Sequence, residues 1–371
     1  MKIGIDGHTL GSQSSGNENY CLKLLRDLAK VKPNGDRYVV YFTHLSGLPK
    51  IPVVDQFKVK RIFPANPLIR VPFSFPFECR RDKLDVFHAQ YIISPFCHCR
   101  TVATIHDILF ESHPEFYTRA ENFYFRALIP GSARRADHVI TVSQFSKNDI
   151  VSRYGVNPDK VTVVEQDPRD EFRLMDGDEC REAILRKYGI APPFILYVGR
   201  VNARKNLVRL VEAFSRLHRK GVRHQLVIVG KQDWMAEEVV QKAKELSLEH
   251  AVKFPGYVDW DDVPLFYNAA ELLAFPSICE GFGLPVMEAM ACGLPVVTSY
   301  GSSLEEVAGG AAVLVDPCSI QSIADALEKV LTDPQLALSL REKGLKRVAD
   351  FRSARKPQQT VSIYHQVCGK N

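Results

Sequence analysis

Residues 276–295 read Pro-Ser-Ile-Cys-Glu-Gly-Phe-Gly-Leu-Pro-Val-Met-Glu-Ala-Met-Ala-Cys-Gly-Leu-Pro, a stretch that joins the end of a strand to the start of a helix. The run Leu272–Phe275 before it predicts a short buried strand, which the first proline ends. Pro285 suits the first turn of a helix, and we expect that helix over residues 286–292, before a glycine. Free backbone N–H groups and the positive end of the helix dipole therefore lie near residues 282–285, where they favour a phosphate.

Two glutamates, Glu280 and Glu288, lie in this stretch beside the predicted phosphate site. A carboxylate next to such a site repels the phosphate, so we expect both glutamates to hold hydroxyl groups of something attached to it. Gly281 and Gly283 allow backbone angles that other residues avoid, and they let a ligand approach the main chain closely. A sugar nucleotide fits this site because it carries both a diphosphate and hydroxyl groups.

Strands alternate with helical patterns along the 371 residues of the chain. This length suggests two domains, and the repeated strand–helix order predicts an α/β fold with parallel sheets covered on both faces. A polar, acidic stretch over residues 167–179 places the boundary, so residues 1–168 form the first domain and residues 169–351 the second. Residues 352–371 carry apolar side chains at helical spacing, which predicts a terminal helix that packs back on the first domain.

The composition excludes several classes of protein. Hydrophobic residues make up 46% of the chain and charged residues 25%, as in ordinary globular proteins, and the net charge of +5 argues against a nucleic-acid partner. No apolar run approaches the roughly 20 residues that a membrane-spanning helix needs. The nine cysteines form no C-x-x-C pair and follow no signal peptide, which argues against zinc and favours reduced thiols in a cytoplasm.

The carboxyl ends of parallel strands are the places where such folds bind ligands, so a cleft between the two domains is the expected active site. Three cations, Arg200, Arg204 and Lys205, follow the predicted strand Phe194–Val198. Arg200 and Lys205 are suited to bind a diphosphate and to offset the negative charge on a departing nucleoside diphosphate. In the first domain, His106 follows another predicted strand and forms a titratable pair with the aspartate after it.

On these residues the chain resembles the retaining glycosyltransferases of family four, which are group 1 glycosyltransferases. The specific match is the E-x7-E element from Glu280 to Glu288 in its glycine-proline frame. Further matches in the second half are Tyr197–Arg200, Lys205–Leu207, Phe254–Val258 and Ser303–Val307. Matches to a mannosyltransferase-like branch in the first half are Ile3–Gly7, Thr104–Asp107 and Ala136–Ser143. The resemblance implies the GT-B fold, in which two Rossmann-like parallel-sheet domains face each other across a cleft.

The resemblance implies a role for each matching side chain. Arg200 and Lys205 would hold the diphosphate of a nucleotide sugar, with GDP or UDP as the nucleotide. Glu288 would bind the ribose hydroxyls, and Glu280 the hydroxyls of the transferred sugar. His106 would lie beside the reacting sugar carbon, so His106 and Glu280 are the expected catalytic residues.

Main-chain contacts follow from the same resemblance. The backbone of Phe282, Gly283 and Leu284 would meet the phosphate and the sugar, and main chain near Val258 would contact the base. Gly16, in a glycine- and serine-rich loop of the first domain, would approach the diphosphate from the opposite side. The loop that begins at Gly16 lacks the arginine usual in this branch and adds a carboxylate, which leaves the acceptor open.

Neither a metal nor another cofactor is expected, because the cations and the helix terminus would neutralise the charge of the leaving group. Two D-x-D triplets, Asp176–Asp178 and Asp259–Asp261, are interpreted as surface acids rather than metal ligands. Retention of configuration would follow a front-face displacement, in which the leaving phosphate accepts the proton of the acceptor.

Three alternatives come from other classes. A sugar-nucleotide epimerase shares the GT-B fold but should lack the E-x7-E frame. A catalytically silent sugar-nucleotide-binding protein would keep Arg200 and Lys205 without needing His106. A dinucleotide-dependent dehydrogenase should show G-x-G-x-x-G after the first strand, and Gly11 and Gly16 lack that spacing.

The acceptor is expected to be a saccharide or a lipid-linked saccharide. Lysines and arginines interleave with phenylalanines over residues 58–83, and two accounts of this region stay open. It is either a solvated face beside a core or a basic, aromatic surface that contacts anionic lipid on the inner face of a membrane. His8 and the other histidines outside the motifs are expected to be structural or on the surface.

Overall fold

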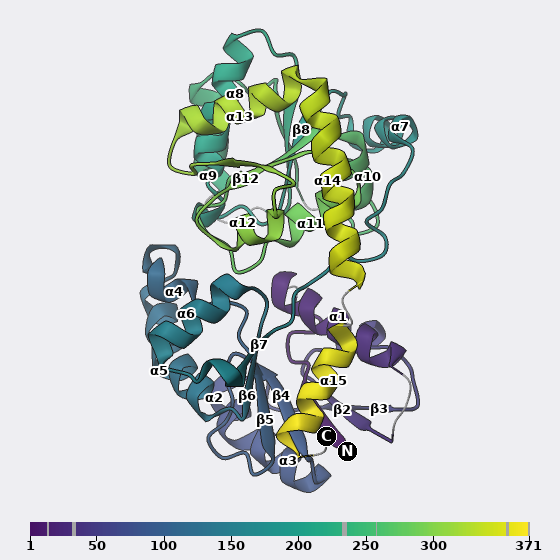
Figure 1. The fold of residues 1–371 in the computed structure, drawn as a ribbon, viewed down its shortest axis with the longest axis vertical. Helices are drawn as coiled ribbons and strands as arrows, with labels where there is room; N and C mark the ends of the chain where they lie inside the picture. The colour runs from purple at the N-terminus through teal and green to yellow at the C-terminus, as the bar shows by residue number, and fades with distance from the viewer. Residues whose placement is uncertain (13–14, 32–34, 232–235, 257, 354–355, 370–371) are drawn as a thin grey trace. The chain divides into compact units, whose positions relative to one another are not determined.

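The computed structural model describes residues 1–12, 15–31, 35–231, 236–256, 258–353 and 356–369. The chain divides into two compact units, which Figure 1 shows. The first unit consists of Met1–Glu165 and Arg355–Asn371, and the second of Gln166–Ala354. The sequence predicted the domain boundary after Pro168, whereas in the structure the first unit ends at Glu165.

The described strands of the first unit form a seven-stranded parallel sheet in the order β3-β2-β1-β4-β5-β6-β7. Their bounds are β1 Lys2–Asp6, β2 Arg37–Phe42, β3 Phe57–Arg61, β4 Val86–Gln90, β5 Arg100–Thr104, β6 His138–Thr141 and β7 Val161–Val163. In the register of the central strands, Ile5 lies opposite Val40 on one side and His88 on the other.

Alternating side chains of this sheet belong to two separate hydrophobic cores, one on each face. Along β2, Val39 and Tyr41 belong to one core, while Tyr38, Val40 and Phe42 belong to the other. Successive residues of a strand point to opposite faces, so both faces of the sheet are covered by helices. This confirms the predicted parallel sheet with two covered faces.

The helices of the first unit supply the other half of each core. They are α1 Ser15–Lys30, α2 Pro67–Ile69, α3 Phe75–Asp82, α4 Leu109–Ser112, α5 Arg119–Arg135, α6 Gln144–Tyr154 and α15 Lys356–Val367. Figure 1 shows the yellow helix α15 beside α1, and Val361, Ile363 and Tyr364 of α15 are buried in the same core as α1. The hydroxyl of Tyr364 lies 2.6 Å from Nδ1 of His88, which ties the terminal helix to β4.

The second unit contains a six-stranded parallel sheet in the order β10-β9-β8-β11-β12-β13. Its strands are β8 Phe194–Val198, β9 Gln225–Val229, β10 Val252–Gly256, β11 Leu272–Phe275, β12 Val296–Ser299 and β13 Val313–Val315. Its helices are α7 Gly177–Tyr188, α8 Leu207–Arg219, α9 Ala236–Glu245, α10 Val263–Ala269, α11 Leu284–Ala291, α12 Ser303–Ala308, α13 Ile320–Thr332 and α14 Pro334–Ser353.

Helix α11 begins earlier than the sequence predicted. It covers Leu284–Ala291 instead of residues 286–292, because Gly283 caps it and Pro285 occupies its first turn. Gly283 has a φ of 108°, a conformation that glycine adopts at little cost. The turn before the helix is thus as tight as the glycine-proline frame indicated.

Candidate functional site

In the second unit the candidate residues gather where the strand order reverses. The chain builds β8, β9 and β10 outward in one direction and then places β11 on the other side of β8. In open parallel sheets, ligands bind outside the carboxyl ends of the strands at such a reversal. The segments that follow β8 and β11 carry the cations at 200–205 and the quoted stretch at 276–295, respectively.

Glu280 is the centre of a buried ion cluster. Its carboxylate accepts hydrogen bonds from Arg204 Nη1 at 2.7 Å and from Lys205 Nζ at 2.5 Å. Arg204 Nη1 also donates to the carbonyl of Cys279 at 3.0 Å, and Lys205 Nζ lies 4.8 Å from the ring centre of Phe275. The segments after β8 and β11 are therefore joined by charge as well as by backbone.

Burial and pairing act against each other in this cluster. Burial alone would raise the pKa of the Glu280 carboxyl, but Arg204 and Lys205 outweigh burial and hold that pKa below its usual value. Burial lowers the pKa of Lys205, and Glu280 opposes that change. Because a donor diphosphate would bring new negative charge to these cations, the cluster is suited to exchange one anionic partner for another.

The structure shows where the three cations lie, and the expectation that Arg200 and Lys205 bind a diphosphate stays a prediction. Lys205 is buried against Glu280, Arg204 accompanies it, and Arg200 is exposed to solvent. Arg204 was one of the three cations named from the sequence, but no role was predicted for it. Its signal was its place between Ala203 and Lys205, immediately before a helix.

The turn that precedes α11 is held by side-chain hydrogen bonds. Ser303 Oγ donates to the carbonyls of Glu280 at 2.7 Å and Phe282 at 3.1 Å. Phe282 is buried, and a Cβ on Gly283 would lie 2.5 Å from Leu304 Cδ2. The backbone from Phe282 to Leu284 is thus presented in one conformation at the start of a helix, as a phosphate contact requires.

Glu288 lies inside α11, 8% exposed, and accepts a hydrogen bond of 3.0 Å from the hydroxyl of Tyr267 on α10. Burial raises the pKa of the Glu288 carboxyl to about 7, although the hydrogen bond from Tyr267 and the charge of Arg169 pull it down. No pattern in the sequence indicates Tyr267, because its contact with Glu288 depends on how two helices pack.

Val258 is buried directly after β10, and residue 257 lies outside the described residues. The neighbouring strand ends pack backbone against backbone. Gly230 donates its N–H to the carbonyl of Gly256 at 3.0 Å, and a Cβ on Gly230 would lie 2.0 Å from the carbonyl oxygen of Gly199. Only glycine fits at Gly230, so the ends of β8, β9 and β10 form a close-packed edge beside Val258.

The first unit has its own reversal of strand order, between β1 and β4. His106 follows β5, is 8% exposed, and its Nε2 lies 3.2 Å from Oε1 of Gln90 at the end of β4. The rings of Tyr20 and Tyr91 meet the imidazole edge-on at 4.6 Å and 5.5 Å. Burial lowers the pKa of His106 to about 4, so the imidazole is neutral at neutral pH.

Gly16 does not lie in a loop, as the sequence predicted, but in the first turn of α1. The glycine- and serine-rich composition before it was interpreted as a longer loop than the chain forms. Gly16 is exposed, and a Cβ there would meet nothing within 4 Å. Its lack of a side chain is therefore not required by packing in the first unit.

The first acidic triplet has a structural role. Asp176 caps α7, where its carboxylate accepts hydrogen bonds from the N–H groups of Asp178 at 2.9 Å and Glu179 at 3.1 Å. Asp259 and Asp261 of the second triplet are exposed. Within the described ranges, no group of three or more histidine, cysteine, aspartate and glutamate side chains is arranged to hold a metal ion.

Comparison with known proteins agrees with this geometry. The family model described as glycosyl transferases group 1 matches residues 181–347, and the one described as glycosyltransferase family 4 matches residues 14–166. O-antigen chain mannosyltransferase B of Escherichia coli is 30% identical over 287 residues, which cover 76% of this chain and 75% of that protein. The chain belongs to the group 1 glycosyltransferases.

A further relative of this glycosyltransferase is also named as a mannosyltransferase. The serotype-specific mannosyltransferase WbdA of Escherichia coli is 30% identical over 259 residues, which cover 68% of this chain and 32% of that protein. The chain thus spans about a third of WbdA. The family and these relatives support a hexosyltransferase, and they do not favour the epimerase or the silent binding protein.

Solved structures show the same fold. Sucrose-phosphate synthase from Thermosynechococcus elongatus matches with a TM-score of 0.81 at 21% identity over all of both chains. Anabaena HepE in complex with UDP and glucose matches with a TM-score of 0.75 at 21% identity, over 99% of this chain and 100% of that one. At these identities the likeness concerns the fold, and it confirms two Rossmann-like parallel-sheet domains of the GT-B type. Among the described residues, every helix is too short or too polar to cross a membrane.

Proposed function

We propose that this glycosyltransferase moves a hexosyl unit, with retention of configuration, from a nucleotide-diphosphate sugar to a saccharide or lipid-linked saccharide. The observation that carries the proposal is the ion cluster of Glu280 with Arg204 and Lys205, which lies beside the start of α11. In this proposal the second unit, the donor domain, holds the nucleotide sugar and the first unit serves the acceptor side.

The donor roles follow the proposal residue by residue. Lys205, Arg204 and Arg200 neutralise the diphosphate, while the backbone of residues 282–284 donates to it. Glu280, released from part of its pairing, accepts hydrogen bonds from the transferred sugar. Glu288 accepts hydrogen bonds from the ribose, and the backbone at Val258 contacts the base.

Mannose is the proposed sugar and GDP the proposed nucleotide. Support comes from relatives named as mannosyltransferases of O-antigen chains. UDP is the competing nucleotide, because HepE was solved with UDP-glucose. Thermal unfolding with GDP-mannose, UDP-glucose, ADP-glucose and dTDP-glucose separates them, since a ligand at 100 times its Kd stabilises the folded state by about 2.7 kcal/mol.

Transfer of radiolabelled mannose from GDP-mannose to a saccharide is the direct test of the function. We expect a labelled glycoside whose anomeric configuration matches that of the donor. Donor binding without release of GDP or transfer of label would instead support the silent binding protein.

The proposed chemistry is a front-face displacement. The bond from the anomeric carbon to the leaving phosphate breaks as the bond to the acceptor oxygen forms, and the acceptor proton passes to the leaving phosphate oxygen. His106, neutral at working pH, positions the sugar by hydrogen bonding rather than by charge. No metal takes part in this scheme, so activity that survives EDTA is expected, and full loss that Mg²⁺ restores would contradict it.

The proposal includes a peripheral contact with a membrane, in which a surface of the first unit binds an anionic bilayer. A cavity of about 780 Å³ in the first unit is lined mainly by apolar side chains of residues 62–77 and by Phe96, and its polar lining consists of Ser74, Glu78, Arg80 and His98. Around it Phe63, Phe73 and Phe77 are 79%, 66% and 62% exposed. Apolar side chains grouped in this way mark an interaction surface.

The charges around this apolar surface select the kind of partner. Between residues 61 and 83 the exposed charged side chains are all cations, namely Arg61, Arg80, Arg81 and Lys83. The carboxylates of Glu78 and Asp82 are both paired with Lys60. Aromatic side chains inside a cationic rim fit the headgroup region of an anionic leaflet, where a lipid-linked acceptor is found. All nine cysteines are free thiols, which fits a site on the cytoplasmic side.

A further inference from the structure

A second constellation of polar side chains lies at the reversal of strand order in the first unit. Asp6 is the last residue of β1, is 4% exposed, and both of its carboxylate oxygens lie 2.8 Å from Nδ1 of His8. The backbone N–H of His8 also donates to Asp6 Oδ1 at 3.0 Å. A carboxylate accepts hydrogen bonds only, so Nδ1 of His8 carries a proton, and in the neutral imidazole Nε2 is the acceptor atom.

The His8 side chain is both held and accessible. Thr43 Oγ1 donates to the carbonyl of His8 at 3.0 Å, and Gly7 N–H donates to the carbonyl of Tyr41 at 2.7 Å, which pins the loop to β2. The side chain of His8 is 29% exposed, and its Nε2 has no hydrogen-bond partner within the described part of the chain. A fixed imidazole with an accessible acceptor atom is a preorganised binding group.

Arg70, in another segment, adds positive charge near Asp6. Arg70 is buried, with 6% of its surface exposed. One Nη of its guanidinium donates a hydrogen bond to the carbonyl of Ala65, while its Nε is buried without a hydrogen-bond partner. Burial would raise the pKa of Asp6, but His8 and Arg70 hold it below its usual value. Arg70 belongs to the same segment as Phe73 and Phe77 of the apolar surface, so one stretch of chain serves both features.

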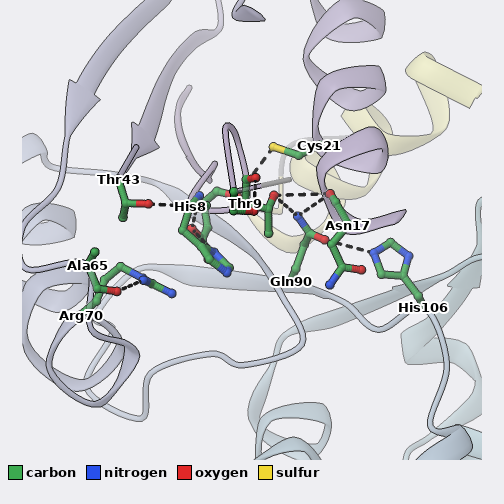
Figure 2. Close-up of polar contacts among 11 residues, drawn as sticks. His8, Thr9, Asn17, Cys21, Thr43, Ala65, Arg70, Gln90 and His106 are labelled. Atoms are coloured by element: carbon green, nitrogen blue, oxygen red, sulfur yellow. Dashed lines mark hydrogen bonds and ion pairs between the residues drawn. The ribbon is translucent and has the colours of Figure 1, made fainter. Parts of the chain in front are cut away.

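A chain of hydrogen bonds connects neighbouring strand ends. Gln90 Nε2 donates to Thr9 Oγ1 at 3.4 Å and to the carbonyl of Asn17 at 3.3 Å, while its Oε1 faces His106. Figure 2 shows these contacts between His8 and His106, with Arg70 on the far side of His8. Two polar groups thus lie at these strand ends: the pair of Asp6 and His8, and the set that Gln90 forms with Thr9, Asn17 and His106.

We propose that His8, oriented by Asp6, binds a hydroxyl group of a neutral saccharide acceptor. This proposal rests on the proposed glycosyl transfer, because it names the acceptor side of that reaction. The bound hydroxyl is one that does not attack, and it donates its hydrogen bond to His8 Nε2, while the attacking hydroxyl passes its proton to the leaving phosphate of the donor. An anionic acceptor fits less well, because a neutral imidazole carries no charge to attract it and the carboxylate of Asp6 repels it.

The test compares two histidine–carboxylate pairs of the same unit. His8→Ala removes the proposed acceptor contact, and His8→Gln returns an oxygen near the position of Nε2. His113→Ala is the matched control, because His113 Nδ1 lies 3.1 Å from Glu115 two residues away and its side chain is 32% exposed. Three quantities are measured: transfer to methyl α-D-mannopyranoside, donor hydrolysis without acceptor, and thermal unfolding.

We expect His8→Ala to lower kcat/KM for the mannoside about ten-fold, mainly through KM, because one hydrogen bond is lost. Donor hydrolysis should stay within about two-fold, and His8→Gln should recover part of the loss. Equal behaviour of His8→Ala and His113→Ala, or hydrolysis that falls as far as transfer, would overturn the proposal.

Two further outcomes separate this proposal from the function itself. A wild-type protein that consumes none of the sugar nucleotides contradicts glycosyl transfer as a whole. A wild-type protein that hydrolyses donor but transfers to mannose 6-phosphate in preference to the methyl mannoside contradicts the neutral acceptor alone. Binding can also be measured without turnover, from the ¹⁵N signal of His8 Nε2, which the His8→Gln variant assigns. This signal should shift when the mannoside is titrated into the protein. A signal that does not shift would count against the site.

Discussion

Glu288 and Tyr267 form a buried hydrogen bond of 3.0 Å, and burial raises the pKa of the Glu288 carboxyl to about 7. A ribose diol donates two hydrogen bonds, which only an ionised carboxylate accepts in full. The proposed nucleotide contact therefore depends on a group that is half-protonated at neutral pH. The partner hydroxyl of Tyr267 comes from a different helix and orients the carboxylate.

Donor affinity should rise with pH across the pKa of Glu288. Below about pH 6 we expect the affinity for GDP-mannose to fall roughly ten-fold per pH unit, and above about pH 8 to level off. Isothermal titration between pH 5.5 and 8.5 measures this. Glu288→Gln should bind donor weakly at every pH, and a wild-type profile without a slope near pH 7 would contradict the ribose role.

The same carboxyl should have the opposite effect on stability. Its folded pKa of about 7 lies above the ordinary value of 4.5, so the folded state binds the proton more tightly and loses stability as pH rises between those values. Glu288→Gln removes this loss. We expect the variant to unfold about 1–4 °C higher than the wild type at pH 8, as a thermal scan would show.

Arg204 should matter for folding, whereas Arg200 should matter only for donor binding. Arg204→Gln leaves Glu280 buried with one cation instead of two, at a cost of about 1–3 kcal/mol in unfolding free energy. Arg200→Gln, at an exposed position, should unfold like the wild type. Both variants should weaken GDP-mannose binding. A denaturant titration in which the two variants unfold alike would contradict this division.

His106→Ala should reduce turnover by about 100-fold while changing donor affinity much less. Because burial lowers the pKa of His106 to about 4, no inflection of kcat between pH 5 and pH 9 should come from this residue. Single-turnover rates measure the effect. His138→Ala is the control, because His138 is equally buried and meets Thr162 at 2.8 Å, away from the reversal of strand order. Near-normal turnover of His106→Ala would remove its catalytic role.

The apolar surface should bind anionic vesicles through its aromatic side chains. The double variant Phe73→Ser, Phe77→Ser should co-sediment roughly ten-fold less with vesicles of 30% phosphatidylglycerol in phosphatidylcholine. Arg80→Gln and Arg81→Gln should each lower binding about five-fold. Phe123→Ser is the control, since Phe123 is 78% exposed on α5. Wild-type binding that does not depend on the anionic lipid would contradict the membrane contact.

Gly16→Ala distinguishes a packing glycine from one that a ligand approaches. A methyl group at Gly16 meets nothing within 4 Å, so the variant should be as stable as the wild type or gain about 0.5 kcal/mol. If the diphosphate approaches this turn, affinity for GDP-mannose should nevertheless fall about ten-fold. Gly177→Ala, in the first turn of α7, is the matched control. Unchanged affinity in both variants would remove Gly16 from the donor contacts.

Much of the fold could be predicted because its signals are local. The strand ended by Pro276, the cap at Gly283 and the proline in the first turn of α11 each depend on neighbouring residues. Helix α5, in contrast, was not predicted, because Pro130 and its weak apolar pattern conceal it. Gly16 was placed in a loop for a similar reason, since glycine and serine before a helix resemble the loop itself.

The sequence by itself determined the class of this protein, its parallel sheets and the stretch with Glu280 and Glu288, because spacing and turn chemistry are written along the chain. Only the tertiary structure decided the partners of those residues. Arg204 meets Glu280, Tyr267 meets Glu288 and Arg70 acts on Asp6 across 76, 21 and 64 positions, respectively. Such pairs depend on which strand ends and helices the fold brings together. Burial then raises the pKa of Glu288, whereas paired charges hold the pKa values of Glu280 and Asp6 below their usual values.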